Sequence, residues 1–201
     1  EAQMFPPEYL KPVLSVLRGL VEHFGVTVVF CTATQPALSA KIGSGLAVFE
    51  GLPPAVEIVD STEIYFKTLK RVDVVLPDMS VSSSWQAIAS DLIKYDQVLC
   101  VVNTRSDCRT LHKLMPEGTI HLSANMCGEE RSEIISKIKM KLAGRETVRV
   151  ISTQLVEAGV DIDFPVVYRA FAGVDSIAQS AGRCNREGHL NKEGRLGKVV
   201  V

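Results

Sequence analysis

The sequence lacks several features that would place it in particular classes of protein. No apolar run approaches the roughly 18 residues that a membrane-spanning helix needs, and the first residues show no signal-peptide pattern. With 46% hydrophobic and 22% charged residues, the composition is that of a globular chain and not of a disordered one. We therefore expect a cytoplasmic chain that folds around one core, or slightly more than one, and that has no membrane partner.

Metal-binding and disulfide patterns are also absent. The five cysteines are odd in number and scattered, and no two form a CxxC pair, so neither a zinc site nor a disulfide framework is indicated. Cys31 and Cys100 lie inside apolar runs, where we expect buried thiols. The four histidines stand apart from any adjacent Asp, and we interpret them as structural or surface residues; they are His23, His112, His121 and His189. No metal site is predicted.

A strong excess of charge of one sign is missing as well. The 22 basic and 23 acidic side chains give a formal net charge of −1. Bulk electrostatics therefore predict no strong affinity for nucleic acid. Any such binding must come from a local group of residues.

Apolar runs that end in polar residues dominate the rest of the sequence. Near-continuous Val, Ile and Leu runs separated by helical patterns predict parallel strands joined by crossover helices. In such sheets a ligand binds beyond the carboxyl ends of the strands, where the polar residues would stand. The alternative is that they only cap the following helices. Four runs show this pattern, at 26–31, 98–102, 119–122 and 148–151, and further strands are expected at 166–168 and from residue 198.

Apolar residues at helical spacing predict four helices. They lie at 10–21, at 85–93 after a serine-rich cap, at 111–115 before Pro116, and at 134–142 before Gly144. Alternating strands and helices predict an α/β fold with a parallel sheet between helices on both faces.

The N-terminal part has a different organisation. One helix and one strand cannot enclose a core, so we interpret residues 1–50 as a piece of another domain. Gly and Pro accumulate in the following stretch, which favours a connector over 51–70. Residues 71–201 then form the α/β domain.

The most informative segment is 149–188, where Gln179, Gly182, Arg183 and Arg186 form the pattern QxxGRxxR. Two arginines three apart on a helix share one face, and Gly182 permits a close backbone approach. Each guanidinium group can bind two phosphate oxygens at once, so this face suits a polyphosphate. The alternatives are a solvated arginine pair and, for Asp161 and Asp163, a purely turn-forming role.

These segments resemble motifs III to VI of superfamily 2 helicases in order and spacing. The sequences of three segments are similar to those of the helicase–nuclease of type I CRISPR interference. They are CTATQPAL, EAGVDIDF and QSAGRCNREG. Glu1-Ala2-Gln3 looks like the tail of a DEAH box without its leading Asp. The four matching segments are 32–34, 103–104, 152–161 and 179–186.

The resemblance implies a RecA-like second helicase lobe of the P-loop NTPase type. The implied activity is ATP-driven unwinding of DNA in antiviral defence. The implied partners are single-stranded DNA, the first helicase lobe and the CRISPR surveillance complex, while the presence of a nuclease domain stays open. Residues 1–50 would then be the C-terminal remnant of the first lobe.

The same resemblance assigns roles to single residues. Arg183 and Arg186 would contact the ATP γ-phosphate, with Arg186 as the arginine finger. Gln179 would sit beside the phosphates, and Gly159 with Asp161 would reach the nucleotide or couple it to DNA. Glu1 would activate the attacking water, and Thr32 and Thr34 would transmit the nucleotide state to the DNA side. The DNA phosphates would be held by Thr104, Ser123, Ser152 and Thr153.

The phosphate-cradling loop GxxxxGK[ST] is absent, because the single Gly-Lys pair, Gly197-Lys198, is followed by Val199. The resemblance therefore places ATP and Mg²⁺ mainly on the first lobe, and we expect the 201 residues alone to hydrolyse no ATP. Two other interpretations stay open. The segment could come from another superfamily 2 DNA or RNA helicase, or act as a non-catalytic nucleic-acid-binding module.

Overall fold

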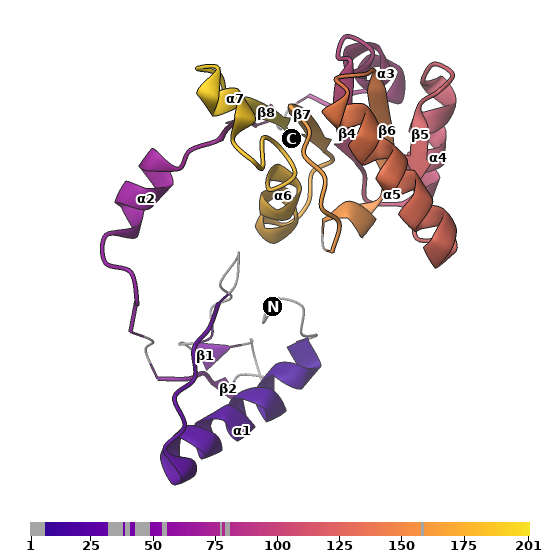
Figure 1. Ribbon diagram of the computed structural model, residues 1–201. Helices are drawn as coiled ribbons and strands as arrows, with labels where there is room; N and C mark the ends of the chain where they lie inside the picture. The colour runs from indigo at the N-terminus through magenta and orange to yellow at the C-terminus, as the bar shows by residue number, and fades with distance from the viewer. Residues whose placement is uncertain are drawn as a thin grey trace. The chain divides into compact units, whose positions relative to one another are not determined.

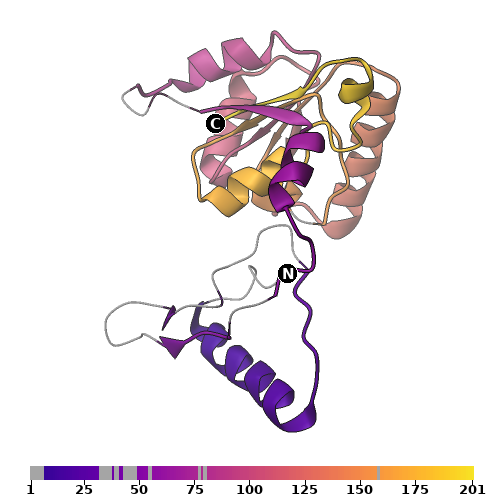
Figure 2. The same cartoon turned by 90° about the vertical axis from the view of Figure 1, so that its left-hand side faces the viewer.

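The computed structural model describes residues 7–31, 38, 41–42, 49–53, 56–76, 78, 81–157 and 159–201. The chain forms two compact units, Glu1–Tyr65 and Phe66–Val201, which are described separately below (Figures 1 and 2). None of the described helices is long and apolar enough to cross a membrane.

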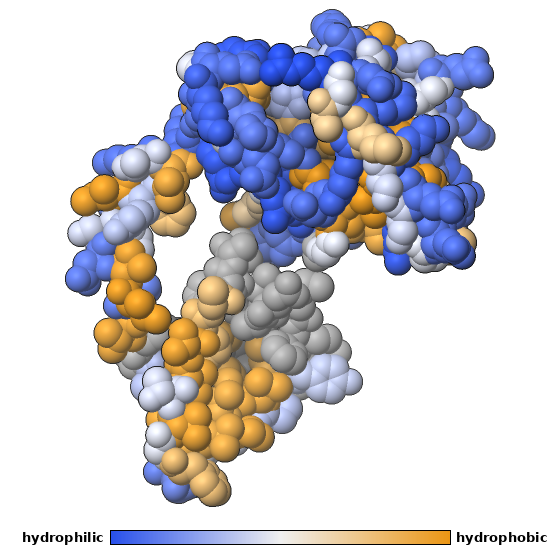
Figure 3. Space-filling model, viewed as in Figure 1, coloured by the Kyte–Doolittle hydropathy of each residue, from blue (hydrophilic) through white to orange (hydrophobic). Residues whose placement is uncertain are grey.

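The first unit contains little regular structure besides one helix. Helix α1 (Pro7–Phe24) precedes a two-residue antiparallel pair, β1 (Lys41–Ile42) with β2 (Phe49–Glu50), and α2 (Thr62–Thr68) crosses the boundary to the second unit. Some apolar side chains of α1 lie at the surface, where Figure 3 shows a hydrophobic region, and others are partly buried. Leu14 is buried, whereas Val16 is 62% and Phe24 is 76% exposed.

The strand predicted at 26–31 is not formed. These residues have no regular secondary structure, and Cys31, which we expected to be buried, is exposed. Val29 is 62% exposed. A strand exists only through hydrogen bonds to a neighbouring strand, and none of the described strands pairs with this run. High β-propensity was therefore not sufficient here.

The second unit is built on a six-stranded sheet in the order β3-β8-β7-β4-β6-β5. Every neighbouring pair is parallel, which confirms the predicted α/β fold. The edge strand β3 was not among the predicted strands. The bounds are β3 Val72–Val75, β4 Gln97–Val101, β5 Ile120–Leu122, β6 Val148–Ser152, β7 Val166–Arg169 and β8 Gly197–Val200.

Helices cover both faces of this sheet, as the alternation along β4 shows. Leu99 and Val101 point into one apolar cluster, which contains Ile138 of α5. Val98 and Cys100 point into the other, which α3 and α4 complete. The helices are α3 (Trp85–Leu92), α4 (Arg105–Leu114), α5 (Gly128–Ala143), α6 (Val174–Ala181) and α7 (His189–Lys192), with a short 3-10 helix, η3 (Gln154–Val156).

Helix ends follow the predicted sequence signals. The Ser84 hydroxyl accepts a hydrogen bond from the Ala87 amide at 3.2 Å and starts α3. Gly144 ends α5 as its C-cap. Because β4, β5 and β6 are parallel, the loops that follow them lie along one edge of the sheet.

Candidate functional site

Polar residues follow three adjacent strands at the carboxyl edge of the sheet. Asn103 and Thr104 come after β4, Ser123 after β5, and Thr153 after β6. The register places Ser152 opposite both Val101 and Leu122, so the three strand ends lie side by side. This is the edge at which parallel sheets bind ligands.

Two of the four predicted hydroxyl groups at this edge bind groups inside the protein. The Thr104 hydroxyl accepts from the Asp107 amide at 3.0 Å and donates to its carboxylate at 2.7 Å, which is the helix-capping alternative. Ser152 is fully buried and donates to the Thr153 carbonyl at 2.8 Å. Ser123 and Thr153 are buried as well, so of the four predicted DNA-contacting residues Thr104 alone is exposed. Phosphate contact by these residues stays a prediction.

The segment after β6 turns sharply and carries three acidic residues. Gly159 adopts a left-handed backbone conformation with φ of 70°, which favours glycine. Asp161 lies at the surface and pairs with Arg186 Nε at 3.3 Å and with Lys139 Nζ at 3.5 Å. Asp163 accepts from the Arg186 amide at 2.7 Å and from the Glu187 amide at 3.1 Å. Asp163 therefore fixes the turn that carries Arg186.

The prediction that the two arginines share one helical face is wrong. Helix α6 ends at Ala181, and Gly182 is its C-cap. Beyond it, Cys184 forms an isolated parallel bridge with Phe164, whose amide donates to the Arg183 carbonyl at 2.9 Å. These long-range hydrogen bonds replace the helical ones, so Arg183 and Arg186 point in different directions.

Arg183 points into the protein. It is 9% exposed, and its Nε and Nη2 donate to the carbonyls of Val156 at 2.8 Å and Glu157 at 2.6 Å. Burial, and then the charge of Arg186, lower the pKa of Arg183. With these two bonds, Arg183 joins the motif around Gln179 to the segment after β6.

Arg186 keeps its side chain 39% exposed between two surface carboxylates, Asp161 and Glu187. Its carbonyl accepts a hydrogen bond from the Arg71 guanidinium. Gln179 lies partly exposed in the last turn of α6. Arg186 is thus the more accessible of the two arginines, and its role as the finger stays a prediction.

Three predicted site residues lie outside the described part of the chain. They are Glu1, Thr32 and Thr34. Within the described part, no group of three His, Cys, Asp or Glu side chains is arranged to hold a metal ion.

Arg169 and Glu157, to which the motif analysis assigned no role although Glu157 begins the EAGVDIDF segment, form the most buried ion pair of the described residues. Arg169 Nε lies 2.8 Å from Glu157 Oε1, and the two side chains are 0% and 8% exposed. The one sequence signal is a charged residue at the end of the apolar run VVYR. Strand patterning assigns no function to such a residue, so sequence reasoning passed over it.

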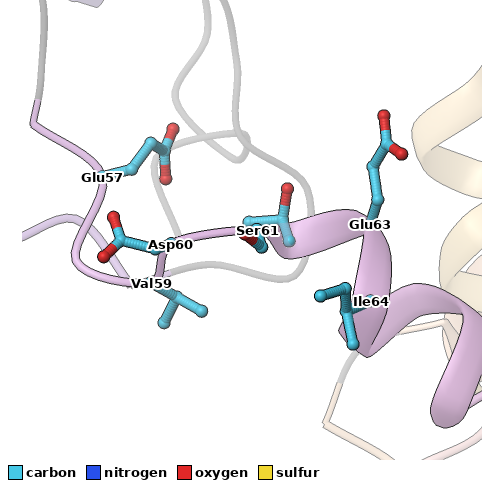
Figure 4. A pocket seen from close by; sticks show the side chains of 7 residues that line it. Glu57, Val59, Asp60, Ser61, Glu63 and Ile64 are labelled. Carbon is cyan, nitrogen blue, oxygen red and sulfur yellow. The ribbon is translucent and has the colours of Figure 1, made fainter.

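A shallow surface hollow lies elsewhere, in the first unit (Figure 4). Three exposed carboxylates, of Glu57, Asp60 and Glu63, line it. Their negative charge disfavours a phosphate ligand, and we assign no role to it. Its other lining residues are Val59, Ser61, Thr62 and Ile64.

Comparison with known proteins gives a consistent match for the second unit. Residues 94–189, which contain the strand-end polar residues, the segment after β6 and both motif arginines, match the family described as CRISPR-associated nuclease/helicase Cas3, C-terminal. The CRISPR-associated nuclease/helicase Cas3 of Haloferax volcanii is 41% identical over 91 residues, which are 43% of this chain and 10% of that protein. The chain thus spans only about a tenth of that curated relative.

Solved structures agree with this match. The crystal structure of T. fusca Cas3-AMPPNP superimposes with a TM-score of 0.53 at 22% identity, over 66% of this chain and 18% of that chain, which shows the fold. A chain of a CRISPR RNA-guided surveillance complex, pre-nicking, gives 0.51 at 25% identity, over 66% and 18%. The predicted resemblance to superfamily 2 helicases, and among them to the CRISPR-associated helicase–nuclease, is therefore confirmed for this chain.

Proposed function

We propose that this chain provides the C-terminal lobe of an ATP-dependent, CRISPR-associated DNA helicase. In this proposal residues 71–201 are the second RecA-like lobe, 51–70 connect it, and 1–50 are the end of the first lobe. The matched residues 94–189 support it, because they carry the strand-end polar residues and both arginines. ATP-driven unwinding would be the activity of the larger protein that contains this segment.

The accessibility of Arg186 is the observation that carries the proposal. Its guanidinium is partly exposed, while the Asp163 carboxylate fixes its backbone. The Asp161 partner is itself 67% exposed, and exposed ion pairs contribute only about 0–1 kcal/mol. A phosphate group can therefore replace this carboxylate at little cost, which suits a residue that must bind and release with every catalytic cycle.

The chemistry follows from charge. Phosphoryl transfer develops negative charge on the transferred group, and a positioned arginine stabilises it. Arg186 would supply that charge, with Gln179 beside the phosphates and with Gly159 and Asp161 in the adjoining turn. ATP and Mg²⁺ would be held mainly by the first lobe, where Glu1 would activate the attacking water.

Arg183 differs from Arg186 in this proposal. Its guanidinium donates to two carbonyl groups in the described structure, so its contact with the γ-phosphate requires that it exchange these partners. Without that exchange it acts by holding the turn.

Single-stranded DNA would bind at the carboxyl edge of the sheet. Thr104 offers an exposed hydroxyl there, and Ser123, Ser152 and Thr153 line the neighbouring strand ends. Contacts of hydroxyl and amide groups to phosphates position a strand without selecting its sequence. Thr32 and Thr34 would transmit the nucleotide state, and a CRISPR surveillance complex would deliver the DNA, in line with the pre-nicking complex among the structural relatives.

The test is Arg186→Ala in a form of the protein that includes the first lobe. ATPase turnover should fall about a thousandfold, because the finger charge is lost, while the melting temperature stays unchanged. Arg195→Ala is the matched control, since Arg195 is also an exposed arginine paired with a glutamate. The 201 residues alone should show no DNA-stimulated turnover. Near-normal turnover of Arg186→Ala would reject Arg186 as the finger.

A further inference from the structure

A buried polar network, not an apolar contact, joins the end of β7 to three other elements. Arg169 is 1% exposed; its two Nη atoms donate hydrogen bonds, and its Nε makes an ion-pair contact without hydrogen-bond geometry. Nε lies 2.8 Å from Glu157 Oε1, Nη1 donates to Asn103 Oδ1 at 2.7 Å, and Nη2 donates to the Ser176 hydroxyl at 2.8 Å. One side chain thus connects β7 with the segment after β6, the end of β4 and α6.

Glu157 extends the network along α6. Its carboxylate accepts from the hydroxyls of Ser176 at 2.7 Å and Ser180 at 3.0 Å, which lie one turn apart on that helix. Its backbone carbonyl accepts from Arg183 Nη2 at 2.6 Å. Glu157 therefore binds both α6 and the arginine that follows it.

The two ends of this network lie at opposite ends of the sheet. At the carboxyl edge, Asn103 Nδ2 donates to the Phe171 carbonyl at 2.9 Å, and Asn103 is the neighbour of Thr104. At the other end, the Arg183 carbonyl accepts from Phe164, which lies before the start of β7. A continuous chain of contacts therefore runs from Asn103 through Arg169 and Glu157 to Arg183.

Stability alone does not account for a buried ion pair at this place. Removing two charges from water costs about as much as their attraction returns, and apolar pairs of the same shape are often at least as stable. What the pair adds is direction, because a guanidinium presents its donors in a rigid planar arrangement. The two hydrogen-bonded partners, Asn103 and Ser176, are therefore held at a set angle to each other, and the Ser176 hydroxyl in turn donates to Glu157.

We propose that Arg169 and Glu157 are positioning residues that couple the nucleotide side of this lobe to its nucleic-acid side. They hold the Asn103–Thr104 strand end, the segment after β6 and the Arg183–Arg186 turn as one unit, so that a shift at one end moves the other. This inference rests on the proposed function for its two ligands. The contacts themselves do not depend on it.

The test replaces the pair by apolar residues, Arg169→Met with Glu157→Leu, in a form of the protein that includes the first lobe. The Kd values for an ATP analogue and for single-stranded DNA should each change by less than about threefold, whereas the stimulation of ATPase by DNA should fall about tenfold or more. A merely structural role would leave that stimulation ratio unchanged in a folded variant. An unchanged ratio would overturn the proposal.

A matched control is Arg149→Met with Asp96→Leu, which removes another arginine–carboxylate contact, at 3.7 Å, away from the network. Its stimulation ratio should equal that of the unchanged protein. An equal loss of stimulation in this control would show that the effect is unspecific and would also overturn the proposal.

A second measurement needs neither ligand and uses the 201 residues themselves. Asn103→Ala removes the hydrogen bonds of Asn103 to Arg169 and to the Phe171 carbonyl, and amide hydrogen exchange should quicken at 154–157 and 183–186, which are distant from residue 103 in the sequence. Asn125→Ala is the control, because Asn125 is also an arginine-bound asparagine at this edge. Quickening confined to the neighbourhood of residue 103 would contradict the network, even if the pair variant fails to fold. Absent ATPase activity in the unchanged protein would instead reject the proposed function, not the network.

Discussion

Two apolar runs of similar composition differ in secondary structure and in burial. Residues 26–31, VTVVFC, have no regular structure, and Val29 is 62% exposed. Residues 98–102, VLCVV, contain most of β4 and are at most 3% exposed. Both were predicted to be strands for the same reason. The difference between them is what surrounds each run.

Strand β4 lies between β6 and β7 and has apolar clusters on both faces. Run 26–31 has no pairing strand among the described residues, and the Val26 amide donates back to the Leu20 carbonyl of α1 at 3.3 Å. β-Propensity chiefly reflects side-chain packing in a sheet, so it does not act alone. The comparison teaches that a strand is a property of a pair of segments.

Thiol chemistry offers the largest contrast between the two runs. Cys100 is buried in β4, and burial raises its pKa to about 12, whereas Cys31 is exposed. The thiolate is the reactive form, so a maleimide at neutral pH should label Cys31 at least about a hundredfold faster than Cys100. Peptide mass spectrometry measures both sites, and labelling in urea should remove the difference. Equal protection of Cys31 would show that residues 26–31 are packed after all.

Truncation of a side chain in each run should differ by several kcal/mol. Leu99→Ala removes a fully buried side chain and should cost about 2–5 kcal/mol of unfolding free energy. Val29→Ala should stay within about 0.5 kcal/mol, because this side chain is mostly exposed. Urea unfolding followed by circular dichroism compares them. A large loss with Val29→Ala would break the comparison.

The smallest of the expected effects is a pH dependence of stability, which we expect from His121 in strand β5 of the sheet. Burial, then the nearby His112 and Arg109, lower the pKa of His121 below its ordinary value of 6.5. The unfolded chain then binds the proton more readily, so this contribution is present above about pH 6.5 and is lost as the pH falls toward the folded pKa. Melting temperatures should therefore fall on acidification less steeply in His121→Gln than in the unchanged chain.

The control for this pH effect is His23→Gln, because His23 lies exposed in α1 of the first unit. Its pH profile should match that of the unchanged chain. If His121→Gln and the unchanged chain have parallel profiles, the histidine in β5 does not titrate as its surroundings indicate.

Much of the second unit could be predicted from the sequence. Helix stripes such as the one over 134–142 and the apolar runs at 98–102 and 148–151 correspond to α5, β4 and β6. Their periodicity is local and strong, and both faces of a buried parallel strand must be apolar. The sequence also placed Thr104 and Thr153 at strand ends, where the structure has them.

Other features depended on contacts between distant segments. The direction of Arg183 follows from the bridge between Cys184 and Phe164, twenty positions apart in the sequence, which no helical periodicity reports. The partners of Arg169 come from three separate elements, so its burial was invisible in the pattern of β7. A long-range hydrogen bond has no local signature, and local patterns therefore cannot predict it.

By itself, the sequence determined the alternation of helices and strands in the second unit and the chemical groups gathered in its motifs, because both are written in neighbouring residues. Only the tertiary structure decided that run 26–31 has no pairing strand among the described residues, that Arg183 turns inward while Arg186 stays accessible, and that Arg169 meets Glu157. Each of these outcomes depends on a partner far away in the chain, and burial is decided where the partners meet.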